Sequence, residues 1–224
     1  MILPPQLIPA LLETMLLEPE GPRHLDRHLD RLATSAGILG HALDRDMLER
    51  SLRIERPSCD GGMELLRLEL VADGSFITSR RTVPEDSGKP VLLAIDELPF
   101  EPGAVRSQHK TCERGRFDAA RARHPYADDV VLVTTSGRVA ETTIANIAVQ
   151  LDGSWWTPPV ADGALPGVGR QLALEAGQVR ERSVSVDELR AAQDVALVSS
   201  VRGWRQARVI GVKPGDEACA ARGR

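Results

Sequence analysis

Residues 24–40, HLDRHLDRLATSAGILG, carry the pattern that most limits how this chain can fold. Apolar residues recur there at spacings of four and three: Leu25, Leu29, Leu32, Ala36 and Leu39. In an α-helix these side chains form one apolar stripe, and Gly40 is a suitable stop for the helix. Arg31 lies in a polar row along one flank of the stripe, whereas Arg27 points away from it. The pattern predicts an amphipathic helix that carries Arg31 beside a buried face.

Strand-like and helix-like segments are interspersed along the rest of the chain. Further helices are expected at residues 44–54, 117–123 and 185–192, and from near Arg170. Apolar runs and turn signals predict strands at residues 63–71, 75–83, 91–95, 129–133, 144–151, 154–157, 194–198 and 208–212. Residues 6–17 are expected to form a buried strand with a turn or short helix around Glu13. This arrangement places the chain in the α/β or α+β class.

Residues 97–108, ELPFEPGAVRSQ, contain two prolines and a glycine. Segments of this kind are typical of linkers between compact units. The chain has 224 residues, which is enough for one large domain or two small ones. We therefore expect a small N-terminal α/β unit at residues 1–98 and a larger C-terminal unit at residues 99–224.

Charge and cysteine content exclude several classes of function. The net charge of −4 provides no basic field to attract nucleic acid. No apolar run approaches the roughly 20 residues that a membrane span needs, and the N-terminus lacks the basic start of a signal peptide. Cys59, Cys112 and Cys219 show no CxxC or Cys–His pairing, which argues against a disulfide framework or a metal site. We expect a cytoplasmic protein.

Lysine is rare in this sequence. Of 28 basic residues, only Lys89, Lys110 and Lys213 are lysines. Lysine can lose its proton and form a Schiff base with a carbonyl compound, which arginine cannot do. Lys89 lies in a Ser-Gly-Lys-Pro loop and Lys213 in a polar tail, so Lys110, in the sequence His-Lys-Thr, is the candidate for this chemistry. Taken alone, a solvated surface lysine would be the commoner interpretation.

Several stretches resemble, in order, the motifs of one enzyme superfamily: LLETM at 11–15, HLDRLATSA at 28–36, GRVAETTIANI at 137–147, TPPVADGALPGVGR at 157–170 and SSVRGW at 199–204. Together with His-Lys-Thr they make the chain similar to fold-type IV pyridoxal-phosphate enzymes. These include branched-chain and D-amino acid aminotransferases and 4-amino-4-deoxychorismate lyase. The resemblance implies a homodimer of two-subdomain chains. It also implies pyridoxal 5'-phosphate in the cleft between the subdomains, with Lys110 on the larger one.

The resemblance assigns roles to single residues. It makes Lys110 the Schiff-base lysine and proton shuttle, and Glu141 the acid that pairs with the pyridine nitrogen of the cofactor. It makes Arg31 a phosphate-binding residue, since a guanidinium can grip a dianion through two hydrogen bonds. Without the resemblance, Glu141 would be interpreted as an exposed strand-edge residue and Arg31 as a solvated helix residue.

Further phosphate contacts are implied by the later motifs. Val168 and Gly169 match a turn before a helix, whose backbone amides hold the phosphate. Ser200 matches a residue whose hydroxyl or amide reaches the same group. Thr142 and Asn146 are expected to be structural or to line the cofactor pocket.

The sequence looks most like the aminodeoxychorismate lyase branch, because His-Lys-Thr and SVRGW occur together. The implied reaction converts 4-amino-4-deoxychorismate, a small molecule, to 4-aminobenzoate and pyruvate in the folate pathway. An aminotransferase for a branched-chain amino acid, a D-amino acid or an amine is the first alternative, since it would use the same residues. Family members usually carry a longer segment before the LLETM position. A truncated, non-catalytic homologue that serves as an interaction module is therefore the second alternative.

Overall fold

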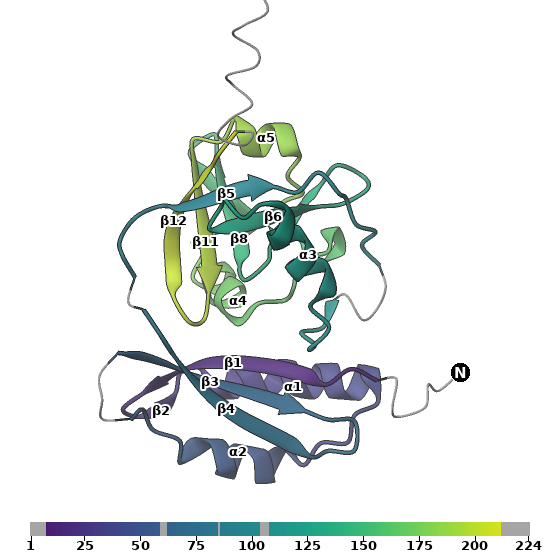
Figure 1. Ribbon diagram of the computed structural model, residues 1–224, viewed down its shortest axis with the longest axis vertical. Coiled ribbons are helices and arrows are strands. Elements are labelled where there is room, and N and C mark those ends of the chain that lie inside the picture. Colours follow the sequence, from purple (N-terminus) through teal and green to yellow (C-terminus); the bar gives the residue numbers. More distant parts are fainter. Residues whose placement is uncertain (1–7, 59–61, 85, 104–107, 212–224) are drawn as a thin grey trace, which may run out of the picture.

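The computed structural model describes residues 8–58, 62–84, 86–103 and 108–211. Within these residues the chain forms two units, one built on a four-stranded sheet and one on an eight-stranded sheet. Figure 1 shows the two units one above the other, with the smaller one at the bottom. None of the helices in this part of the chain is long and apolar enough to cross a lipid bilayer.

The smaller unit is an antiparallel sheet in the strand order β2–β1–β3–β4. Its strands are β1 (Leu11–Glu18), β2 (Gly21–Pro22), β3 (Met63–Leu70) and β4 (Phe76–Val83). Two helices, α1 (Leu25–Leu39) and α2 (Arg45–Arg53), pack on one face of this sheet. The first helix ends at Gly40, whose φ of 79° is a left-handed conformation that favours glycine.

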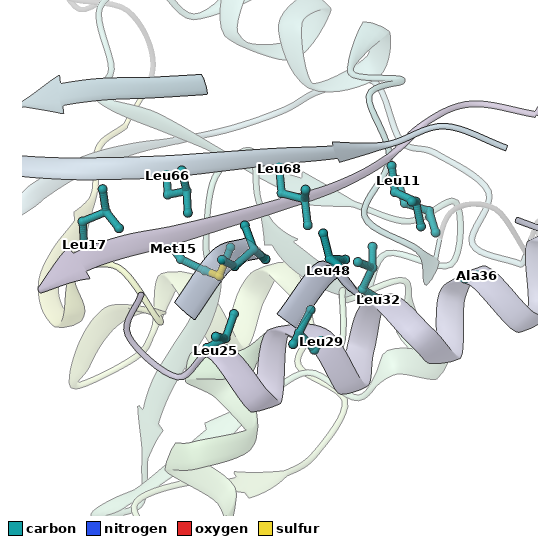
Figure 2. Close-up of a cluster of buried hydrophobic side chains, with 12 residues drawn as sticks. Leu11, Met15, Leu17, Leu25, Leu29, Leu32, Ala36, Leu48, Leu66 and Leu68 are labelled. Carbon is teal, nitrogen blue, oxygen red and sulfur yellow. The ribbon is translucent and has the colours of Figure 1, made fainter. Parts of the chain in front are cut away.

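Leucine side chains fill the space between this sheet and its helices. On β3 the even-numbered residues are buried and the odd-numbered ones are half-buried, as expected for a strand with one face in a core. Figure 2 shows Leu66 and Leu68 of β3 facing Leu25, Leu29 and Leu32 of α1. The odd-numbered residues of β3 lie on the opposite face. The smaller sheet therefore has one apolar face and one more polar face.

The larger unit is a mixed sheet in the strand order β10–β9–β8–β11–β12–β5–β6–β7. Its strands are β5 (Val91–Ile95), β6 (Asp129–Val133), β7 (Val139–Thr142), β8 (Asn146–Leu151), β9 (Ser154–Thr157), β10 (Arg180–Glu181), β11 (Asp194–Ser199) and β12 (Gly203–Val209). The sheet curls, because β7 at one edge is joined to β8 inside the sheet by residues 143–145 alone. One apolar cluster of this unit includes Val131, Val139 and Ile147.

In the described part of the chain, four helices belong to this larger unit and pack against its curled sheet or its loops. They are α3 (Gly115–Arg123), the 3-10 helix η3 (Val160–Asp162), α4 (Val168–Glu175) and α5 (Val186–Arg190). A capping box starts α5, in which Ser185 and Glu188 exchange side-chain and backbone hydrogen bonds. Ala173 of α4 packs near Val198 of β11. Helix α4 also contacts α1 of the smaller unit.

Most predicted helices and strands are present, but the short strands β2, β7 and β10 were not predicted, and two further predictions differ from the structure. Glu13 lies within β1, opposite Leu68 of β3, so the turn or short helix expected around it is wrong. The last strand begins at Gly203 rather than at residue 208, because it pairs as a hairpin with β11; residue 212 of the expected run lies outside the described residues. Strand β5 pairs with β6 and β12 of the larger sheet. We therefore propose that the two units divide between Val83 and Val91, and not at residue 98.

Candidate active site

A cavity of about 1000 Å³ is lined by both units. All six residues to which the sequence assigned roles line it: Arg31, Lys110, Glu141, Val168, Gly169 and Ser200. They come from α1, the segment before α3, β7, the start of α4 and the turn between β11 and β12. The fold thus gathers in one place residues that are far apart along the chain.

Lys110 is tied to the smaller sheet. Its carbonyl accepts a hydrogen bond of 2.8 Å from the Leu12 amide, and Thr111 beside it forms a bridge with Leu11. We expected Lys110 on the larger unit, but its backbone pairs with β1. The side chain keeps some surface in the cavity, yet desolvation, assisted by the charge of Arg31, lowers the pKa of Lys110 to about 8. A fraction of this amine is therefore uncharged near neutral pH and can act as a nucleophile or base.

Glu141 is buried on β7, with 5% of its surface exposed. Its Oε2 accepts hydrogen bonds from the Leu165 amide at 3.1 Å and from the Asn146 side chain at 3.5 Å. Burial raises the pKa of Glu141 to about 7, and the Leu165 hydrogen bond and the charge of Arg116 limit this rise. The interpretation of Glu141 as an exposed strand-edge residue is therefore wrong.

The guanidinium of Arg31 is largely buried at the edge of the cavity. Its Nε and Nη2 donate to the two carboxylate oxygens of Glu13, at 2.8 and 2.5 Å. Its Nη1 donates to the Pro166 carbonyl at 3.3 Å. His28, one turn earlier on α1, has its Nδ1 2.6 Å from the same Glu13 carboxylate. Neither Glu13 nor His28 was assigned a role from the sequence.

The N-terminus of α4 forms a closely packed wall of the cavity. The first helical hydrogen bond is donated by Gln171 to the Gly167 carbonyl, so the amides of Val168 and Gly169 precede the helical ladder. A Cβ on Gly169 would lie 2.4 Å from the carbonyl carbon of Ser199 and 2.7 Å from the amide nitrogen of Ser200. Glycine is therefore needed for this approach. Amides at a helix N-terminus, together with the helix dipole, favour an anion.

The sequence matches the amino-transferase class IV family over residues 10–210. The chain belongs to that family. A Schizosaccharomyces pombe protein, provisionally named an aminodeoxychorismate lyase, is 29% identical over 190 residues, which cover 80% of each chain.

Solved structures of class IV proteins share the fold. One from Mesorhizobium loti, provisionally named an amino-acid aminotransferase, is 30% identical with a TM-score of 0.80, over 90% of this chain and 99% of that one. The 4-amino-4-deoxychorismate lyase of Pseudomonas aeruginosa is 23% identical with a TM-score of 0.77, over 91% and 84%. This second likeness shows the fold alone.

Class IV proteins are enzymes that depend on pyridoxal phosphate. The cavity fits this cofactor chemically, because it combines an amine of lowered pKa, a buried carboxylate and an anion-binding helix N-terminus. These groups match the aldehyde, the pyridine nitrogen and the phosphate of the cofactor. The hypothesis of a non-catalytic module loses support, since it rested on the beginning of the chain and not on any missing site group.

The polar face of the smaller sheet was not predicted from the sequence. Thr14, Arg67, Ser79 and Arg81 line the cavity from β1, β3 and β4. Thr14 stands opposite Arg67 across the strands, and Arg67 stands opposite Ser79. The signal was the alternation in MELLRLEL, which puts Arg67 on the face away from the leucine core.

Proposed function

We propose that this chain is a pyridoxal-phosphate-dependent lyase that converts 4-amino-4-deoxychorismate to 4-aminobenzoate and pyruvate. The observation that carries the proposal is a single cavity in which an amine and a carboxyl group have pKa values moved toward neutrality from opposite directions. Groups tuned in this way suit proton transfer near neutral pH. The similarity to the Schizosaccharomyces pombe protein supports the lyase branch of the family.

Lys110 is the proposed carbonyl anchor and proton carrier. When bound, pyridoxal phosphate stabilises negative charge at the substrate carbon that bears the amine. The side-chain amine of Lys110 would take the proton from that carbon. It then returns a proton to the departing pyruvate fragment, while the remaining ring becomes aromatic. The lowered pKa of Lys110 makes its free amine available for the first of these steps.

Glu141 and the α4 wall are the proposed holders of the two ends of the cofactor. The Glu141 carboxylate would keep a proton on the pyridine nitrogen. The guanidinium of Arg31 and the amides of Val168 and Gly169 would bind the phosphate, with Ser200 on the adjoining turn. All of these residues line the same cavity, which supports this assignment.

The charge of the cavity lining favours a substrate with two carboxylates, such as 4-amino-4-deoxychorismate. Arg67 and Arg81 line it from the smaller sheet, and Arg202 lines it from the turn between β11 and β12. The carboxylates among the described lining residues are Glu113 and Glu141. An excess of arginine attracts an anionic substrate.

An aminotransferase remains the second candidate, supported by the 30% identity to the Mesorhizobium loti protein. The test is a product assay of the cofactor-loaded protein with 4-amino-4-deoxychorismate, and separately with amino donors and a keto acid acceptor. We expect 4-aminobenzoate and pyruvate in equal amounts. Transfer of an amino group to the keto acid without any 4-aminobenzoate would overturn the lyase proposal.

The oligomeric state and the cellular location of the protein are two further points of the proposal. We propose a homodimer, because family members are typically dimers, and a cytoplasmic location, from the cysteine content. The proposed place in metabolism is folate biosynthesis. Light scattering coupled to size-exclusion chromatography tests the first point, and a molar mass of a single chain would contradict it.

A further inference from the structure

The carboxylate of Glu13 is buried between β1 and α1. Its side chain is 2% exposed, and the His28 side chain beside it is 1% exposed. Burial alone would raise the pKa of Glu13, but the charge of Arg31 and the hydrogen bonds from His28 and Arg31 hold it well below its usual range. Glu13 is therefore an anion inside the smaller unit. A buried charge is costly to the fold unless it is paired and hydrogen-bonded.

His28 orients this carboxylate. Burial lowers the pKa of His28, against the opposing effect of Glu13, so the ring is mostly neutral near pH 7. A neutral ring can donate to Glu13 only through Nδ1–H, since Nδ1 is the nitrogen that lies 2.6 Å from Oε2. Within the described residues Nε2 has no hydrogen-bond partner. The hydrogen bond to Glu13 is thus the only one that this ring makes within the described part of the chain, and it orients the carboxylate.

Glu13 in turn fixes the guanidinium of Arg31. Two parallel hydrogen bonds, from Nε and Nη2 to the two carboxylate oxygens, define the plane of the guanidinium as well as its position. The third nitrogen, Nη1, faces the Pro166 carbonyl just before α4. A long side chain that would otherwise lose considerable rotamer freedom on binding an anion is held in place beforehand.

The same strand also holds Lys110. The Leu12 amide donates to the Lys110 carbonyl at 2.8 Å, and Glu13 is the next residue of β1. Consecutive residues of one strand therefore carry the backbone of the lysine and the guanidinium of the arginine. Strand β1 is in turn fixed in the sheet by pairing with β3.

We propose that Glu13, oriented by His28, is a positioning residue that fixes Arg31 relative to Lys110. A cofactor with an aldehyde and a phosphate on one rigid ring needs its two anchors at a constant separation. Strand β1 keeps this separation constant, because Leu12 holds the backbone of Lys110 and Glu13 holds the guanidinium of Arg31. This inference rests on the proposed function, because it takes Lys110 and Arg31 as the two anchors.

The test compares the affinity for pyridoxal phosphate with that for pyridoxal, which lacks the phosphate. Affinities are measured by the visible absorbance of the protein–ligand complex for the wild type, Glu13→Gln, Arg31→Met and the double variant. We expect Glu13→Gln to lower the preference for pyridoxal phosphate at least about tenfold, with little change in the affinity for pyridoxal. In the Arg31→Met background, Glu13→Gln should cause no further loss of preference. Glu18→Gln, on the same strand but paired with Arg23, is the matched control and should keep the wild-type preference.

Folding is followed by thermal unfolding of each apo variant. If Glu13→Gln does not fold, Glu13→Asp replaces it, because it keeps the buried charge but is one methylene shorter and cannot reach Arg31 and His28 together. It should lose part of the preference. Wild-type protein that binds neither compound would contradict the proposed function itself. A wild type that prefers pyridoxal phosphate, with the preference unchanged in both Glu13 variants, would overturn the positioning role alone.

Discussion

Burial moves the pKa values of Lys110 and Glu141 in opposite directions because it penalises whichever form carries charge. It lowers the pKa of the lysine to about 8 and raises that of the glutamate to about 7. One cavity therefore makes both the neutral amine and the neutral carboxyl accessible near physiological pH. Groups with such values can give and take protons without large energetic cost.

Replacement of Lys110 tests the choice of anchor at the residue scale. After incubation with pyridoxal phosphate and reduction with borohydride, we expect the wild-type peptide that contains Lys110 to gain the mass of the reduced cofactor. The variant Lys110→Ala should gain none, because Lys110 is the only lysine among the described residues that line the cavity. Peptide mass spectrometry provides the measurement, and Lys89→Ala is the control that should keep the label. A stable label on the Lys110→Ala protein would mean that another lysine is the anchor.

The raised pKa of Glu141 predicts a pH-dependent stability. The folded state binds a proton to this group up to about pH 7, whereas the ordinary value is 4.5. Stability from this group is therefore fully present below about pH 4.5 and is lost as the pH rises through 7. We expect Glu141→Gln, which does not titrate, to gain up to about 3 kcal/mol relative to the wild type over this range. Urea unfolding of both apo proteins at several pH values measures the difference. A difference that does not change with pH would contradict the assignment.

Single residues were predictable where their chemistry was unusual for the chain. Lys110 stood out because lysine is scarce, and the motifs around Glu141 and Arg31 supplied a context. Glu13 did not stand out, because a glutamate within LLETM reads as a polar interruption of an apolar strand. Its meaning depends on Arg31 and His28, which reach it only after α1 folds back over β1.

At the scale of elements, the contact between α4 and the end of β11 depends on Gly169, which has no side chain. We expect Gly169→Ala to cost about 1–3 kcal/mol of stability, because the added methyl group would overlap the backbone of Ser199 and Ser200. The helix must then move away from the turn, so the affinity for pyridoxal phosphate should also fall. Chemical unfolding and a binding titration measure the two effects.

Gly37→Ala provides the control for that prediction. Gly37 lies inside α1, and a Cβ there would meet nothing within 4 Å. Alanine is the better helix former by about 0.5–1 kcal/mol, so this variant should be slightly more stable than the wild type. If Gly169→Ala were as stable as Gly37→Ala, the close packing at the N-terminus of α4 would not contribute to the stability of the fold.

Elements were predictable when their pattern was long. The stripe in α1 and the alternation in β3 each extend over two or more periods, so periodicity alone found them. The short strands β2, β7 and β10 have two to four residues and leave no periodic trace. Their existence depends on the pairing partners that the rest of the fold brings alongside. The start of β12 was also missed, because it depends on pairing with β11.

At the scale of the whole molecule, the cavity joins the two units, and ligand binding should stabilise them together. With pyridoxal phosphate at about 100 times its dissociation constant, the stabilisation is about 2.7 kcal/mol. For a chain of this size that corresponds to roughly 5–10 °C in the midpoint of thermal unfolding. We expect a single transition that shifts upward in wild-type protein, and a smaller shift in Arg31→Met. Differential scanning calorimetry measures both, and a shift equal in the two proteins would contradict the role of Arg31.

The way in which distant segments come together in space could not be predicted from the sequence alone. The class of fold and the six candidate residues followed from patterns and motifs. The arginines of the smaller sheet reach the cavity only because β1, β3 and β4 pair in one register, and a shift by one residue would turn them into the core. We propose a boundary before residue 91 instead of at residue 98, because strand β5, which precedes the linker, pairs with β6 of the larger sheet.

The two faces of the smaller sheet have different tasks: one stabilises the fold and the other lines the cavity. Its even-numbered β3 residues carry the leucine core, and its opposite face carries Leu65, Arg67, Ser79 and Arg81 toward the cavity. A combinatorial library randomised at these four cavity-facing positions should therefore yield mostly folded proteins, whereas one randomised at Leu66, Leu68 and Leu70 should not. Substrate preference could then change in small steps during evolution or in the laboratory, without the chain first having to acquire spare stability.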